Sequence, residues 1–183
     1  MNKKIVKILN RKSYRLKGHD YGKNGAYFIT FCTKDRVPYF GEIVNQEMIL
    51  NELGEIAHQL WSEIPNQFPF AKLENFVVMP DHIHGIIIID KDSSWDAINR
   101  VPTKDPPSII NGGITGIHNP MIQDSISRII RWFKGRSRFE IKKIQPEFYW
   151  QKLFYDHIIR DEKAFQNIQR YIENNPRAWK EKS

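Results

Sequence analysis

Two histidines, His82 and His84, stand one residue apart in "MPDHIHGIIIID" at the start of a run of isoleucines. In a strand, residues i and i+2 point to one face and lie about 6.5–7 Å apart along the chain, so two imidazoles at this spacing can converge on one ion. Imidazoles with oxygen ligands suit manganese better than magnesium, although magnesium can serve. Without a close third histidine or cysteine, zinc is not favoured. The alternative is two polar residues that precede a buried strand.

A tyrosine and an asparagine, Tyr171 and Asn175, are four residues apart in "RYIENNPRAW". Residues at this spacing are neighbours on one face of a helix. An asparagine oxygen is a hard metal ligand, and if this helix packs beside His82 and His84, a phenol and a metal share one cavity. The pair also fits an ordinary helix, in which Tyr171 extends the apolar seam and Asn175 caps the end. The residues alone leave both interpretations open.

Two further tyrosines, Tyr149 and Tyr155, are the alternatives to Tyr171. Both lie in the strand-like segment 148–159, and neither is followed by a ligand-type residue at helical spacing. We interpret His157, in the same segment, as a structural histidine and not as a third imidazole ligand.

The elements that must position these residues follow from hydrophobic periodicity and from turn signals. The pattern predicts a strand at 26–33, a helix at 46–65, strands at 71–80 and 82–90, a helix at 124–144, a strand at 148–159 and a helix at 161–176. Pro80-Asp81 predicts a tight turn between the second and third strands. The strand after this turn should be buried on both faces, with Gly85 admitting a backbone or a substrate. Pro65 and Pro176 should end their helices.

The first six elements match a ferredoxin-like βαββαβ sandwich, an α+β fold with an antiparallel sheet and helices on one face. The seventh is an additional C-terminal helix that carries Tyr171. The fold hosts many functions and decides none of them.

Length and composition predict one domain over residues 1–183, with a long proline- and glycine-rich insertion loop at 91–124. The net charge of +7 comes from a basic arm at 1–18, which holds seven lysines and arginines and no acid. This arm is either a polyanion contact or a solvated tail. No apolar run is long enough to cross a membrane, and no secretory signal is evident. The single cysteine, Cys32, suggests a reducing compartment.

Four stretches resemble the single-tyrosine HUH transposases, and most of all their REP-associated tyrosine transposase branch. The stretches are "NRKSYRLKGHDYGKNGAYFITFCTKDR", "FVVMPDHIHGIII", "WQKLFYDHIIRDEKAF" and "RYIENNPRAW". HUH denotes histidine, bulky hydrophobe, histidine, and "HIH" fits. In this family the nucleophile is a tyrosine on a late helix, and a glutamine or asparagine four residues later completes the metal site. Tyr171 and Asn175 match that pattern. The resemblance covers nearly the whole chain outside 91–124.

This resemblance implies the ferredoxin-like nuclease fold, a divalent metal (Mg²⁺ or Mn²⁺), and cleavage and rejoining of single-stranded DNA near a hairpin. A metal on His82, His84 and Asn175 would orient a phosphate, and Tyr171 would attack it. The products would be a 5′-phosphotyrosine and a free 3′-hydroxyl. Two alternatives stay open: a nucleic-acid-binding protein that has lost cleavage, and a metal nuclease that uses water.

DNA contacts should come from basic residues near aromatic ones, because single strands bind through backbone charge and base stacking. The candidates are Lys12, Arg15 and Lys17 of the arm, and Arg128, Arg131, Lys134 and Arg138 of the helix at 124–144. The expected partner is single-stranded or hairpin DNA, with no membrane contact. We expect a cytoplasmic, DNA-associated prokaryotic protein. It could be a monomer or a homodimer that exchanges the tyrosine helix.

Overall fold

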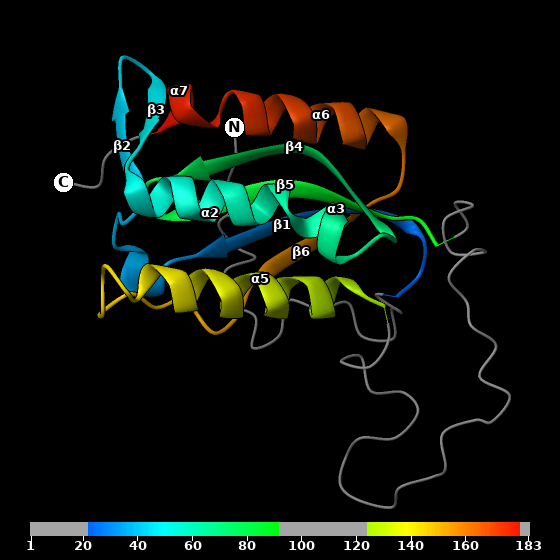
Figure 1. Ribbon diagram of the computed structural model, residues 1–183. Helices are drawn as coiled ribbons and strands as arrows, with labels where there is room; N and C mark the ends of the chain where they lie inside the picture. The colour runs from blue at the N-terminus through cyan, green and yellow to red at the C-terminus, as the bar shows by residue number, and fades with distance from the viewer. Residues whose placement is uncertain (1–21, 92–123, 180–183) are drawn as a thin grey trace, which may run out of the picture.

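A four-stranded antiparallel sheet organises the computed structural model, which describes residues 22–91 and 124–179 (Figure 1). Its strands are β1 (Gly25–Cys32), β4 (Ala71–Met79), β5 (His82–Ile89) and β6 (Tyr155–Ile159), in the spatial order β4-β5-β1-β6. Every neighbouring pair is antiparallel. This order and direction are those of a ferredoxin-like sandwich, so the predicted fold class is confirmed.

Helices cover both faces of this sheet. Helices α2 (Glu52–Ser62) and α5 (Ile126–Ile141) pack in the larger hydrophobic layer, and α6 (Glu162–Glu173) packs in a smaller layer on the other face. Each helix begins at a side chain that accepts a backbone N–H three residues later, as N-caps do: Asn51, Ser125 and Asp161. Gly135 does not interrupt α5.

Strand β5 is buried on both faces, as predicted. Ile83 and Ile87 enter the larger layer, and Ile86 enters the smaller one. Pro80 and Asp81 form the turn from β4 into β5. The expectation for Gly85 was wrong: a Cβ there would lie 2.5 Å from Cζ2 of the Trp61 indole, so the close neighbour is a core side chain.

The helix predicted at 46–65 begins later than expected. Residues Glu47–Leu50 form β3, which pairs with β2 (Gly41–Val44) in a separate two-stranded hairpin. Its two turn residues, Asn45 and Gln46, both have positive φ (51° and 68°), as a tight two-residue hairpin requires. Pro65 does not end a helix; it lies at the start of the short helix α3 (Ile64–Gln67).

Two other boundaries also differ from the prediction. The strand predicted at 148–159 is regular only in β6, and its first half is joined to the sheet by a single bridge between Thr33 and Trp150. Helix α6 ends at Glu173, and Asn174 links it to α7 (Asn175–Ala178). Pro176 therefore sits in the first turn of a new short helix, where a proline is tolerated.

The arm predicted at 1–18 and nearly all of the loop predicted at 91–124 lie outside the described residues. A one-turn 3-10 helix, η1 (Lys34–Arg36), follows β1. Among the described residues, no helix has the length and apolarity needed to span a bilayer.

Candidate functional site

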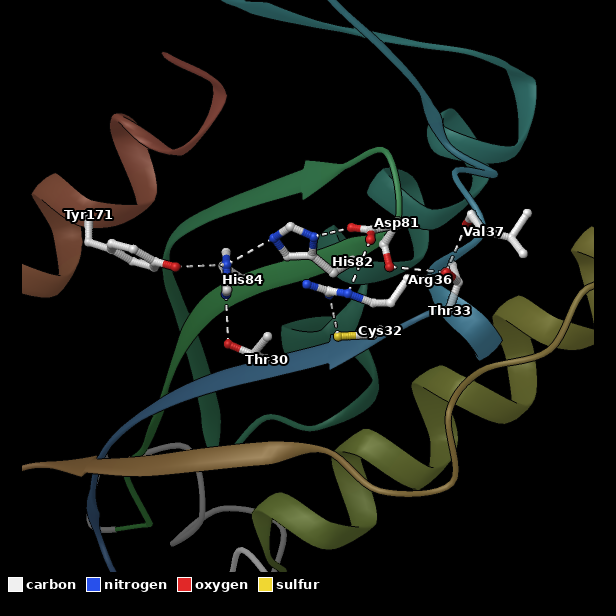
Figure 2. A network of polar contacts seen from close by, with 9 residues as sticks. All are labelled: Thr30, Cys32, Thr33, Arg36, Val37, Asp81, His82, His84 and Tyr171. Atoms are coloured by element: carbon white, nitrogen blue, oxygen red, sulfur yellow. Dashed lines mark hydrogen bonds and ion pairs between the residues drawn. The ribbon is translucent and has the colours of Figure 1, made fainter. Parts of the chain in front are cut away.

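The two histidines of the sequence motif lie at the start of β5 and face each other. Their Nε2 atoms are 3.0 Å apart, and both side chains are buried (Figure 2). The rings meet edge to face, with centroids 4.5 Å apart. The strand geometry that the sequence predicted is therefore present, with both imidazoles on the face covered by α6.

Each imidazole is held by its other ring nitrogen. Nδ1 of His82 lies 2.5 Å from Oδ1 of Asp81, and Nδ1 of His84 lies 2.6 Å from Oγ1 of Thr30 on the neighbouring strand. A carboxylate can only accept, so Nδ1 of His82 carries its proton and donates it to Asp81. Nε2 of His82 is then left with a bare lone pair that points toward His84.

Helix α6 brings Tyr171 to the same place. The Tyr171 hydroxyl lies 3.3 Å from Nε2 of His84 (Figure 2). Its ring packs edge-on against Phe28, with centroids 6.0 Å apart. The side chain is 48% exposed, whereas Ile172, the next residue, is buried in the smaller layer and anchors the helix. The phenol is thus held by apolar contacts and stays open to solvent.

Asn175, at the start of α7, reaches the other imidazole. It is buried, and its side chain is close enough to His82 to raise the pKa of that imidazole, against the larger effect of burial. The chain passes from β6 to α6 through Arg160 and Asp161 alone. This direct turn places Tyr171 and Asn175 over the histidines of their own chain.

Burial keeps both imidazoles neutral. It lowers the pKa of His82, although the Asp81 carboxylate acts in the opposite direction. The pKa of His84 is lowered further by burial, by the neighbouring His82 and by the Arg36 guanidinium. A metal ligand must be a deprotonated imidazole, so this environment favours the ligating form near neutral pH.

The donor set fits a divalent transition ion. Two nitrogens about 2.1 Å from one ion and at right angles would be about 3.0 Å apart, which matches the Nε2 separation of 3.0 Å. No group of three His, Cys, Asp or Glu side chains in the described ranges could hold a metal. The Asn175 amide oxygen, next to His82, is a donor of the kind that Mn²⁺ and Mg²⁺ accept.

Sequence reasoning missed Asp81 and Arg36. One oxygen of Asp81 lies on His82, and the other lies 3.1 Å from Nε of Arg36. Arg36 has a left-handed backbone (φ 58°), and its Nη1 also lies 2.7 Å from Sγ of Cys32. Asp81 stands next to the histidine motif, a signal that could have been used. Arg36 carries no local signal, because only the fold brings it to Asp81.

The predicted DNA-binding residues are not gathered at this site. Lys12, Arg15 and Lys17 lie outside the described residues. The other four are on α5, which covers the opposite face of the sheet from the histidines.

The four α5 residues differ in their surroundings. Arg128 is paired with Asp124 at 2.5 Å, and Arg131 is exposed. Lys134 is half-buried and donates to the carbonyl of Gln151; burial lowers its pKa to about 8. Arg138 stands over the ring of Tyr149.

The rival tyrosines lie elsewhere. Tyr155 is on β6 and contacts Phe28, and burial raises the pKa of its phenol, which disfavours the phenolate needed for attack. Tyr149 is on the α5 side of the sheet, next to Lys34 and Arg138.

Two known proteins are similar to this chain in sequence. An uncharacterized protein of Haemophilus influenzae is 39% identical over 176 residues, which cover 95% of this chain and 92% of that protein. A second protein of the same organism, named "Putative REP-associated tyrosine transposase", is 23% identical over 158 residues, or 86% of this chain and 73% of its own. No family model matches the sequence.

Among solved structures, a REP-associated tyrosine transposase bound to a REP hairpin superimposes with a TM-score of 0.54. It is 18% identical, and the alignment covers 90% of this chain and 73% of the other. The chain belongs to the family of the first Haemophilus protein. It is also similar to REP-associated tyrosine transposases, in sequence to the second Haemophilus protein and in fold to the solved structure. The resemblance inferred from the four sequence stretches is therefore confirmed, and the solved transposase shares the fold of this chain.

Proposed function

We propose that the protein is a metal-dependent enzyme that cuts and rejoins single-stranded DNA by attack of Tyr171 on a phosphodiester. Its similarity to REP-associated tyrosine transposases supports a transposase-like, DNA-processing function. The observation that carries the finer proposal is the convergence of the Tyr171 hydroxyl on the two facing imidazoles. A buried asparagine, Asn175, lies next to His82.

His82, His84 and Asn175 would hold the metal in this proposal. The bound ion would polarise a non-bridging phosphate oxygen and offset its negative charge. Asp81 and Thr30 would fix the imidazoles through their Nδ1 atoms, which keeps both Nε2 atoms aimed at one point.

Tyr171 would form the bond. Its oxygen attacks phosphorus, an O–P bond forms, and the bond from phosphorus to the 3′-oxygen breaks. The chain then carries a 5′-phosphotyrosine, the phenol proton passes to solvent, and the departing strand takes a proton to become a 3′-hydroxyl. The exposure of Tyr171 gives a DNA strand and water access to the phenol. Because one phosphodiester replaces another, rejoining is the reverse of the same step and needs no nucleotide.

Hairpin DNA is the substrate class that we propose. Support comes from the solved relative, whose structure holds a REP hairpin. Tyr171 would act in cis, since it reaches the histidines within one chain after a direct turn from β6.

A covalent-adduct assay tests this proposal. The protein is incubated with 5′-labelled and 3′-labelled hairpin DNA and Mn²⁺, and the products are separated on a denaturing gel. We expect a protein–DNA adduct that carries the 3′ label, because the tyrosine is joined to the fragment on the 3′ side of the cut. The adduct should be absent in Tyr171→Phe. Tyr155→Phe is the matched control and should retain the adduct. Nicking without an adduct, unchanged in Tyr171→Phe, would indicate attack by water, and binding without nicking would indicate a non-catalytic protein.

A further inference from the structure

The described part of the chain holds a second cluster of functional groups, on the α5 side of the sheet. Its members are Lys34, Arg138, Lys142 and Tyr149, which we call the Tyr149 cluster. The Arg138 guanidinium carbon and Lys142 Nζ both lie 4.4 Å from the centroid of the Tyr149 ring, and Lys34 Nζ lies 5.9 Å from it. The Tyr149 side chain remains 37% exposed.

The hydrogen bonds of Tyr149 leave its proton available. Lys142 donates to the phenol oxygen at 3.2 Å, and the Arg138 guanidinium lies over the ring. A phenol has one proton to give, and an ammonium group is a donor that cannot accept it. Lys142 and Arg138 also lower the pKa of Tyr149, which makes its hydroxyl a stronger donor. The cluster therefore presents three cations and one O–H group to an acceptor in solution.

The charges of the cluster are largely uncompensated. Within the described residues, neither Arg138 nor Lys142 forms an ion pair with a carboxylate. Asp35 lies 4.0 Å from Lys34, but both side chains are mostly exposed. Glu140, the nearest acid on α5, is already paired with Arg136 and Lys143. An anion would meet net positive charge here.

The cluster lies at the same end of the sheet as the histidines. Figure 1 shows the C-terminal end of α5 at the end where α7 lies. The backbone N–H of Thr33 donates to the Asp81 carbonyl, and that of Lys34, the next residue, donates to the Tyr149 carbonyl. Arg36 reaches back to the Asp81 side chain. The segment 33–36 thus connects the site on one face with the Tyr149 cluster on the other.

We propose that the Tyr149 cluster binds a phosphate of single-stranded DNA beyond the cleavage site, with the Tyr149 hydroxyl donating to a phosphate oxygen and Arg138 and Lys142 supplying the charge. This inference rests on the proposed function and adds a second contact to it. A strand that leaves the histidines would pass Arg36 and turn around the end of the sheet onto this cluster. The contact is made to the DNA backbone and does not depend on base sequence.

Binding is measured by fluorescence anisotropy with the full chain carrying Tyr171→Phe, so that the DNA stays intact. The probes are two hairpin-free oligonucleotides of unrelated sequence, and salt is varied from about 50 to 200 mM. Into this parent we introduce Tyr149→Phe, or Arg138→Gln together with Lys142→Gln. Lys72→Gln is the control, because Lys72 is an exposed lysine near the start of β4, at the opposite end of the sheet.

We expect the double charge variant to flatten the plot of log affinity against log salt by about 0.7, the change for one lost phosphate contact on a single strand. Tyr149→Phe should weaken binding about three- to tenfold. Both effects should be equal for the two oligonucleotides, and the melting temperature should not change. Lys72→Gln should have neither effect.

If both cluster variants bind DNA with the affinity and the salt slope of the parent, the inference is wrong and the proposed function still stands. The inference is also wrong if Lys72→Gln flattens the slope, per charge removed, as much as the double charge variant does. The effect would then come from the overall charge of the protein and not from the cluster. If the parent binds neither single strands nor hairpin DNA, the proposed function itself fails.

Discussion

The Tyr171 hydroxyl lies 3.3 Å from Nε2 of His84, although 87 residues separate them in the chain. The contact depends on the short turn after β6 and on Ile172, which seats α6 on the sheet. Asn175 follows one turn later and meets His82. One helix and the turn after it therefore bring one side chain to each of the two imidazoles.

Asp81 should control metal affinity without touching the metal. Its carboxylate holds the His82 ring by Nδ1 and leaves Nε2 free. Loss of such a partner typically lowers metal affinity about 10- to 100-fold, so we expect this loss for Mn²⁺ in Asp81→Asn, measured by isothermal titration calorimetry. Asp35→Asn is the control, because Asp35 is an exposed acid of the neighbouring η1 helix. If wild type and Asp81→Asn bind Mn²⁺ with equal affinity, Asp81 has no role in metal binding.

The Asn175 amide should be the third protein ligand. We expect Asn175→Ala to weaken Mn²⁺ binding by at least about tenfold while the protein stays folded. Asn174→Ala is the adjacent control, because the Asn174 amide is exposed and donates to the Arg170 carbonyl of its own helix. Calorimetry on both variants gives the answer. If Asn175→Ala keeps full affinity, Asn175 is only a hydrogen-bond partner of His82.

Much of the fold could be predicted because its apolar residues follow strand or helix periodicity closely. β5 is the clearest case: its isoleucines fill both layers, and sequence predicts a strand buried on both faces. The β2–β3 hairpin was missed for a physical reason. Ile49 and Leu53 have the spacing of a helix, and the turn at Asn45-Gln46 lacks the glycine that usually reveals such a hairpin.

For the site, sequence could pair His82 with His84 and Tyr171 with Asn175, because each pair is local. That the two pairs meet was inferred from a family resemblance and not from spacing. The link from Arg36 through Asp81 to His82 could not be predicted, because it joins η1 to the β4–β5 turn. A contact between residues far apart in the chain cannot be predicted from the periodicity of the residues around either one.

Two glycine-to-alanine substitutions should have opposite effects on stability. In Gly85→Ala the new methyl group would lie 2.5 Å from Trp61, a fully buried indole, and 3.0 Å from Cβ of Phe76. We expect overpacking to lower the free energy of unfolding by about 1–3 kcal/mol, measured by urea denaturation. In Gly135→Ala no atom lies within 4 Å of the added carbon, and helix propensity should raise stability by about 0.5–1 kcal/mol. If Gly85→Ala leaves the free energy of unfolding unchanged, the side chains around Trp61 can shift to accommodate the added methyl group.

Lys134 should give the protein a pH-dependent stability on the alkaline side. Burial lowers its pKa to about 8 in the folded chain, whereas an unfolded lysine titrates near about 10.4. Between these values the unfolded chain binds a proton that the folded chain does not, so this group makes the free energy of unfolding rise with pH. The rise should be on the order of 2 kcal/mol, and it should be absent in Lys134→Met.

The measurement is a set of denaturation curves from about pH 7 to 10.5, taken as the difference between wild type and variant so that other titrations cancel. Methionine has an unbranched apolar side chain of similar length and lacks the ammonium group, whose Nζ lies 6.0 Å from the centroid of the Phe31 ring. Lys163→Met, at an exposed position on α6, should reproduce the wild-type profile. A difference curve that is flat for Lys134→Met would mean that the Gln151 carbonyl and solvent keep the ammonium charged at all these pH values, and Lys134 would then be available as a cation for DNA.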